Sequence, residues 1–147
     1  MKQLIFTLAA FILMQTAGAQ KVKWTFTAKK LSNDKYELHM TATVPSGWHI
    51  YSQNTPDDGP IPTKFTFNNN ALLKVEGKVK EVGKLEKFYD PNFKVEVKYY
   101  SDKVDFVQVV KLKSKIKTNV SGQVESMICN DVRCMPTATE NFNIALK

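Results

Sequence analysis

Hydrophobic and polar residues alternate along most of the chain beyond residue 20, and this alternation predicts β-strands. In residues 22–28, apolar side chains alternate with lysine and threonine, and residues 36–44 repeat the pattern with a continuous apolar face. A period of two is typical of half-buried strands. The polar residues 32–34 between the two segments predict a turn, so we expect the segments to form an antiparallel hairpin.

The same pattern continues to the C-terminus, and no segment shows helical periodicity. The longest irregular stretch, residues 47–65, contains prolines and glycines, and ordered loops of this length are often functional. Seven or eight short strands separated by turns predict an all-β fold, an antiparallel β-sandwich in one domain. Beyond the first hairpin, strands are expected at residues 64–67, 72–82, 94–100, 104–112, 120–129 and around 142–146, and the lysine-rich residues 111–117 are interpreted as strand.

The N-terminus has the pattern of a secretory signal peptide. Lys2 precedes an apolar run over residues 4–14, and small residues follow at 17–19. The run is shorter than the roughly 20 residues that a membrane-spanning helix needs. We therefore expect residues 1–19 to be a signal peptide and residues 20–147 to form one soluble, exported domain.

The charge of the chain is carried almost entirely by lysine. The sequence has 21 basic and 14 acidic residues, a net charge of +7, and Arg133 is its single arginine. Proteins that bind nucleic acid favour the arginine fork, which makes a nucleic-acid partner a poor fit. We interpret the lysines mainly as solvated strand faces; a patch for an acidic partner or a membrane surface is the alternative.

Cys129 and Cys134 are the only cysteines, and they flank a short connection between two expected strands. Their Cα atoms could approach to about 5.5 Å, as a disulfide requires, and pairing is typical of an exported protein. A bond across so small a loop would stabilise the fold by only about 2 kcal/mol. The pattern leaves open a structural disulfide, a redox centre or a zinc site, although neither His39 nor His49 has finger-like spacing to the cysteines.

Charges beside the cysteines bear on their reactivity. Arg133 adjoins Cys134 and would favour its thiolate, whereas Asp131 would oppose it. Because the thiolate is the species that attacks a disulfide, Arg133 is a candidate residue for any redox chemistry of this pair.

Three segments resemble the N-terminal periplasmic domain family of the thiol:disulfide interchange protein DsbD. They are "VPSGWHIYSQNTPDDGPIPTKF" (44–65), "EKFYD" (86–90) and "VSGQVESMICNDVRCMPTATENFNI" (120–144). The last carries the most specific pattern, a strand that ends in cysteine and a second cysteine that precedes a proline and the final strand. The resemblance implies an immunoglobulin-like β-sandwich.

The resemblance also implies roles for individual residues. Cys129 and Cys134 become the redox pair, with Cys134 forming the mixed disulfide with partners and Cys129 resolving it. The segment 86–90 becomes a loop that caps the site until a partner displaces it. The residues implied around the pair are Glu86, Phe88 and Tyr89 in this cap, and Trp48 and Tyr51 in the segment after the second strand.

Together these observations predict a stand-alone, monomeric thiol–disulfide oxidoreductase of the periplasm. It would carry electrons between a membrane-embedded thiol reductase and thioredoxin-like or other oxidised periplasmic proteins. The resemblance implies no metal or organic cofactor beyond the Cys129–Cys134 disulfide. The alternative hypothesis is a non-enzymatic secreted β-sandwich that binds a partner and uses the disulfide to order a loop.

Overall fold

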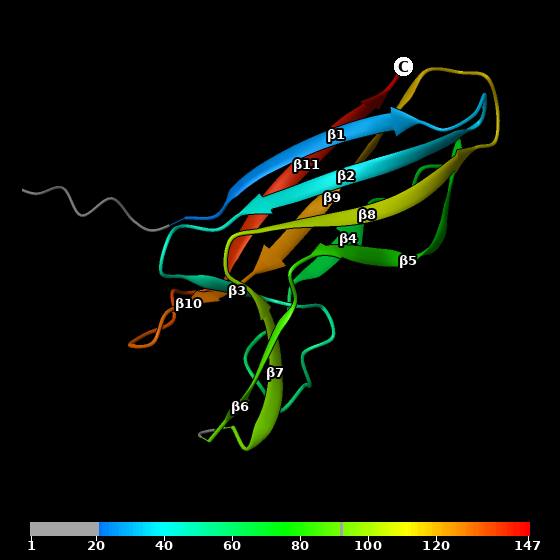
Figure 1. Ribbon diagram of the computed structural model, residues 1–147. Helices are drawn as coiled ribbons and strands as arrows, with labels where there is room; N and C mark the ends of the chain where they lie inside the picture. Colours follow the sequence, from blue (N-terminus) through cyan, green and yellow to red (C-terminus); the bar gives the residue numbers. More distant parts are fainter. Residues whose placement is uncertain (1–20, 92) are drawn as a thin grey trace, which may run out of the picture.

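The computed structural model describes residues 21–91 and 93–147 and has an all-β fold in which every strand pairing is antiparallel (Figure 1). The expected signal peptide, residues 1–19, lies outside the described residues. Within the described ranges, no helix is long and apolar enough to cross a membrane. The strands are Lys23–Lys30 (β1), Lys35–Thr43 (β2), His49–Tyr51 (β3), Lys64–Phe67 (β4), Leu73–Gly83 (β5), Glu86–Asp90 (β6), Val95–Tyr100 (β7), Lys103–Leu112 (β8), Thr118–Ser126 (β9), Ile128–Cys129 (β10) and Ala138–Leu146 (β11).

Three sheets build the molecule. The sheet β1-β2-β8-β5 faces the sheet β11-β9-β4 across one shared hydrophobic core, and the two form the main sandwich (Figure 1). The third sheet, in the order β10-β3-β7-β6, extends from one end of the sandwich (Figure 1). Because β9 belongs to the sandwich and β10 to the third sheet, the chain changes sheets at Met127, just before the first cysteine.

The predicted first hairpin is confirmed, including its faces. β1 pairs with β2 from Lys23 opposite Thr43 to Lys30 opposite Tyr36. The expected apolar face of β2 is buried, and the alternate residues of β1 pack against the same core. Phe106 of β8 lies at the centre of this core, fully buried, with its ring 5.0 Å from that of Phe65 and 5.8 Å from that of Trp24.

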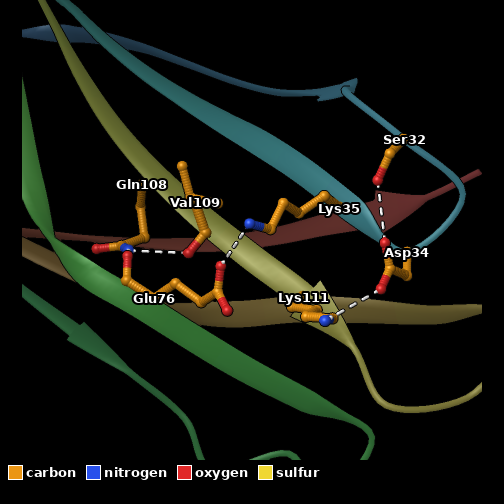
Figure 2. Close-up of polar contacts among 7 residues, drawn as sticks. All are labelled: Ser32, Asp34, Lys35, Glu76, Gln108, Val109 and Lys111. Atoms are coloured by element: carbon orange, nitrogen blue, oxygen red, sulfur yellow. Dashed lines mark hydrogen bonds and ion pairs between the residues drawn. The ribbon is translucent and has the colours of Figure 1, made fainter.

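Polar contacts fasten the turn between β1 and β2 to the neighbouring strands (Figure 2). Asp34 accepts a hydrogen bond from the Ser32 hydroxyl at 3.0 Å and pairs with Lys111 of β8 at 3.4 Å. Lys35 pairs with Glu76 of β5 at 3.1 Å. These contacts lie at the end of the sandwich opposite the cysteine pair (Figure 1), so the turn is held independently of the third sheet.

Glu81 of β5 joins the main sandwich to the third sheet. One carboxylate oxygen accepts hydrogen bonds from the Ser52 hydroxyl at 2.7 Å and from the Tyr100 hydroxyl at 2.8 Å. The other accepts one from the backbone N–H of Gln53 at 2.7 Å. Ser52 follows β3 and Tyr100 ends β7, so a single carboxylate connects three segments that lie far apart in the sequence.

Four expectations about strand boundaries were wrong. The irregular stretch 47–65 contains strand β3, and the expected loop 86–90 is strand β6. The expected strand 120–129 is divided at Met127, and β8 ends at Leu112, so residues 113–117 form the bend before β9 rather than a strand. The described part of the chain therefore has eleven strands instead of seven or eight. Very short strands form where a distant segment supplies hydrogen bonds, and the local sequence pattern does not indicate such a partner.

Candidate functional site

The two cysteines form a disulfide at the free edge of the third sheet. Cys129 ends β10, and Cys134 returns to pair with it as an isolated antiparallel bridge, with 3.9 Å between the Cα atoms. The N–H of Met135 donates to the carbonyl of Ile128 at 2.9 Å, which extends the pairing by one step. The expected arrangement, two cysteines on either side of a hairpin connection, is present.

The loop between the cysteines is organised by Asn130. Its side-chain oxygen accepts hydrogen bonds from the backbone N–H groups of Val132 and Arg133, at 2.9 and 2.8 Å. Its own N–H donates to the carbonyl of Arg133 at 2.9 Å. This is the local turn that asparagine side chains favour. It fixes the separation of the cysteines without drawing on the core, so the loop can keep its form when the disulfide opens.

The two cysteines differ in exposure. Cys129 is 2% exposed and belongs to a small buried cluster, whereas Cys134 is an exposed residue. Val132, at the tip of the loop, is 89% exposed. An approaching protein would therefore meet Cys134 first, and Cys129 would be reached only through its partner sulfur.

The face of the third sheet that carries Cys129 is largely aromatic. Cys129 lies directly opposite His49 of β3, and Tyr51 lies directly opposite Tyr99 of β7. The His49 ring lies 4.6 Å from the Tyr99 ring and 5.2 Å from the Tyr51 ring, and its Nε2 lies 3.1 Å from the Tyr51 hydroxyl. Cys129, Tyr51 and Val97 form the buried cluster of this face.

Burial shifts the pKa values of the three titratable rings on this face, His49, Tyr51 and Tyr99, in favour of their uncharged forms. Desolvation lowers the pKa of His49 despite the opposing effect of the nearby carboxylates of Asp131 and Glu86. Desolvation raises the pKa of Tyr51 to about 12, with smaller contributions from Asp90 and Tyr99. The pKa of Tyr99 is raised for the same main reason. At neutral pH the face is therefore lined by a neutral imidazole and two protonated phenols.

The expected cap residues lie on β6, the far edge strand of the third sheet. Strands β3 and β7 separate β6 from the cysteine pair. Phe88 is 45% exposed, and its ring contact is with Tyr99, at 6.5 Å. Tyr89 is exposed, and Glu86 lies opposite Tyr99 in the strand register. The structure thus connects Phe88 to the site through Tyr99 and His49, rather than placing its ring against the disulfide.

Trp48 and Arg133 meet on the other side of the cysteine loop. Trp48 is buried in the main core, and the guanidinium of Arg133 lies 5.9 Å above its ring. A cation–π contact of this kind is worth about 0.5–1 kcal/mol at an exposed site. It anchors the cysteine loop to the sandwich. Trp48 is therefore a core residue that touches the site through Arg133, whereas Tyr51 lies within the site itself.

An apolar recess also borders the cysteine loop. It has a volume of about 180 Å³ and is lined by Trp24, Ile128, Met135 and Pro136 together with residues of β9, of β11 and of the segment just before β1. Met135 and Pro136 directly follow Cys134, so this exposed residue adjoins an apolar surface. Across residues 21–91 and 93–147, no group of three or more His, Cys, Asp or Glu side chains is arranged to hold a metal ion.

Sequence reasoning did not identify two residues of the site, His49 and Tyr99. His49 was considered as a zinc ligand without suitable spacing to the cysteines, and Tyr99 belonged to an ordinary strand pattern. Both lie on the same face as Cys129 because the register pairs β3 with both β10 and β7. The alternation of His49 and Tyr51 around Ile50 was the available signal, but it could not indicate which strand lies opposite.

Comparison with known proteins agrees with this geometry. A family model described as thiol:disulfide interchange protein DsbD, N-terminal, matches residues 16–146. The crystal structure of the Neisseria meningitidis DsbD N-terminal domain in the reduced form is similar with a TM-score of 0.52 and 14% identity, over 83% of this chain and 84% of that chain. No curated protein sequence matches.

A second similar structure is the N-terminal periplasmic domain of ScsB from Proteus mirabilis. It has a TM-score of 0.58 and 16% identity, over 89% of this chain and 48% of that chain. This chain therefore spans about half the length of the ScsB domain. At these identities the likeness concerns the fold, and it confirms the expected immunoglobulin-like β-sandwich.

Proposed function

This chain belongs to the family of DsbD N-terminal domains, which are thiol–disulfide interchange domains, and on that premise we propose that it carries electrons to oxidised proteins through Cys129 and Cys134. The observation that carries the proposal is the asymmetry of the pair. An exposed Cys134 is bonded to a buried Cys129 across a short loop whose turn is hydrogen-bonded by Asn130.

The proposed reaction runs in two exchange steps. The thiolate of Cys134 attacks one sulfur of the partner's disulfide, forms a mixed disulfide and releases the other partner sulfur as a thiolate, which takes up a proton. The thiol of Cys129 then loses its proton and attacks Cys134, which releases the second partner sulfur. The pair loses two electrons and the partner gains them, so the products are the Cys129–Cys134 disulfide and a reduced partner.

Phe88 of the expected cap is proposed to shield the site. It lies opposite Val97 of the buried cluster, whereas its neighbour Tyr89 lies opposite Glu96, on the other face of the sheet. Phe88 packs on Tyr99, which packs on His49 opposite Cys129, so the aromatic rings form a continuous layer over this face. β6 is an edge strand paired only with β7 in the third sheet. A partner that displaces β6 would uncover the layer, and Glu86 would move with it.

We further propose the setting in which the domain works. Residues 1–19 direct export, residues 20–147 form the working domain, and the domain acts in the periplasm. A membrane-embedded thiol reductase would restore the reduced pair, and thioredoxin-like or other disulfide-bonded periplasmic proteins would receive the electrons. The apolar recess beside Cys134 fits the apolar surface that such a partner would present around its own disulfide.

Single cysteine variants test the order of attack. Cys129→Ser leaves the exposed thiol without its resolving partner, so we expect it to accumulate a stable mixed disulfide with oxidised glutathione. The matched variant Cys134→Ser retains only the buried thiol and should form far less adduct. Mass spectrometry of the two proteins at equal exposure measures the difference. Preferential adduct formation by Cys134→Ser would contradict the proposed order.

The reduction potential separates the proposal from the alternative of a binding module with a structural disulfide. We expect a potential well above about −300 mV, the range below which disulfides resist the glutathione pool. We expect the double variant Cys129→Ser/Cys134→Ser to remain folded, since the bond closes a small loop worth about 2 kcal/mol. A potential below that range, together with unfolding of the double variant, would favour the structural role.

A further inference from the structure

His49 lies where it could handle the proton of the resolving cysteine. In the antiparallel register, Cys129 and His49 are direct partners on adjacent strands. Side chains of directly opposed residues project from the same face, with Cβ atoms about 4.5–5.5 Å apart. On one side, the strand partner of Cys129 is His49 of β3. On the other side, its partner is Cys134.

The imidazole is held in a defined orientation. Tyr99 packs against it at 4.6 Å, Tyr51 meets it edge-on at 5.2 Å, and the Tyr51 hydroxyl lies 3.1 Å from Nε2. Because Tyr51 remains a phenol at neutral pH, its oxygen can accept a hydrogen bond from Nε2–H. That tautomer leaves the Nδ1 lone pair available to accept a proton, and Nδ1 makes no hydrogen bond within residues 21–91 and 93–147.

We propose that His49 is the general base that deprotonates Cys129 during resolution of the mixed disulfide. This inference rests on the proposed function and adds to it a residue that neither the sequence pattern nor the cysteine pair assigns. Nδ1 takes the proton of the Cys129 thiol as its sulfur attacks Cys134. The electron pair of the broken bond leaves on the partner's sulfur, and the proton passes from the imidazolium to that thiolate or to water.

A buried thiol needs such a base. Apolar surroundings disfavour the thiolate, and Cys129 is almost fully buried, whereas the exposed Cys134 can ionise in contact with water and beside Arg133. A neutral histidine is available at pH 7 because burial lowers its pKa. The charged and titratable groups that act on the imidazole are Glu86 on β6, Tyr99 on β7, Tyr51 on β3, and Asp131 in the cysteine loop.

The experiment uses the reduced mature protein and the small disulfide 5,5′-dithiobis(2-nitrobenzoate). Attack by Cys134 releases the first thionitrobenzoate, and attack by Cys129 on the mixed disulfide releases the second, so the two steps appear as two phases of absorbance. We expect His49→Gln to leave the first phase unchanged and to slow the second about 10²-fold at pH 7, the usual size of a general-base contribution.

The pH profile distinguishes proton transfer from packing. In the wild type, the second phase should hold its rate as pH falls below the pKa of the Cys129 thiol and then decline as His49 becomes protonated. In His49→Gln it should follow the thiolate fraction of Cys129 alone, and the two proteins should converge at high pH, where the thiolate forms without a base. His49→Phe, which keeps an aromatic ring between the tyrosines, should behave like His49→Gln.

Two controls distinguish a general base from a packing role of His49 and from failure of the proposed function. His39→Gln removes the other histidine, whose Nδ1 pairs with Asp105 at 2.6 Å on the sandwich, and should leave both phases unchanged. Wild-type rates in His49→Phe, or equal slowing of both phases in either variant, would assign His49 a packing role and overturn the inference. Failure of the wild type to release the second thionitrobenzoate would instead overturn the proposed function.

Discussion

The main sandwich and the outer face of the third sheet differ in how many hydrophobic residues they bury. Within residues 21–91 and 93–147, the main core contains eighteen buried hydrophobic residues, Ile50, Tyr100 and Ile128 of the third sheet among them. The other face of the third sheet, which carries Cys129, buries only Tyr51, Val97 and Cys129 as hydrophobic residues. Stability in proteins follows buried apolar area. The sandwich therefore fixes the fold, while the smaller cluster holds the cysteine pair in a region that can open locally without unfolding the protein.

The difference explains where a redox pair can operate. A disulfide inside the sandwich would have to break packing each time it opened, because protein interiors are densely packed. At the edge of the third sheet, the loop is held by Asn130 and by the contact of Arg133 with Trp48. The cysteine loop is thus attached to the main sandwich, while the disulfide itself lies outside the main core.

The largest expected effect comes from cutting into the sandwich core. Phe106→Ala removes a fully buried ring that contacts Phe65 and Trp24, and we expect it to lower the free energy of unfolding by about 3–5 kcal/mol. Denaturant unfolding measures the loss. The matched change in the small cluster, Val97→Ala, should cost about 2 kcal/mol and should alter the reactivity of Cys129. An equal loss in the free energy of unfolding for the two variants would contradict the view that the main core contributes more to stability than the small cluster.

Cutting the link between the regions should have the next largest effect. Glu81→Ala removes the acceptor for Ser52, Gln53 and Tyr100, and we expect a loss of about 3 kcal/mol because the donors lose their partner. Hydrogen exchange should increase in β3 and β7 more than in β2. Glu81→Gln retains one carbonyl acceptor and should lose less. If exchange rises uniformly across all strands, Glu81 is not a specific link.

High pH should weaken the small cluster selectively. The unfolded Tyr51 loses its proton near pH 10, but in the folded protein its pKa is about 12, so the unfolded state is favoured increasingly as pH rises between these values. We expect a loss on the order of 2 kcal/mol across that window, with the full contribution present below pH 10. Denaturant unfolding at several pH values measures it.

The variant Tyr51→Phe isolates this effect. It removes the hydroxyl and should therefore lose less stability than the wild type over the same pH window. Tyr100, whose pKa is raised by burial and by its hydrogen bond to Glu81, remains in both proteins and cancels in the comparison. Identical pH slopes for the two proteins would show that ionisation of Tyr51 is not coupled to folding.

The smallest effect is expected at the end of the sandwich opposite the cysteines. Lys35→Ala breaks a partly exposed ion pair with Glu76 (Figure 2), and such pairs contribute about 0.5 kcal/mol. The rates of both thionitrobenzoate phases should stay at their wild-type values. A changed rate would show that the ion pair of Lys35 affects the distant cysteine pair, which the separation of the main core from the small cluster does not predict.

The sequence by itself determined the strands whose hydrophobic pattern is complete. The alternation in β1 and β2 fixed their faces and their hairpin, because successive side chains of a pleated strand point to opposite sides whatever lies around them. The two cysteines and their short loop were equally evident. The resemblance in residues 120–144 correctly indicated the family, since that pattern lies within one continuous segment.

Only the tertiary structure decided which distant residues meet. The change of sheet at Met127 placed Ile128 and Cys129 on opposite faces of a different sheet, and the register of β3 placed His49 opposite Cys129. Strand β6 formed where a loop was expected, because β7 supplies its hydrogen bonds. Alternation is a local property of the backbone, whereas register and pairing depend on partners far away in the chain, and the environment of Cys129 depends on both.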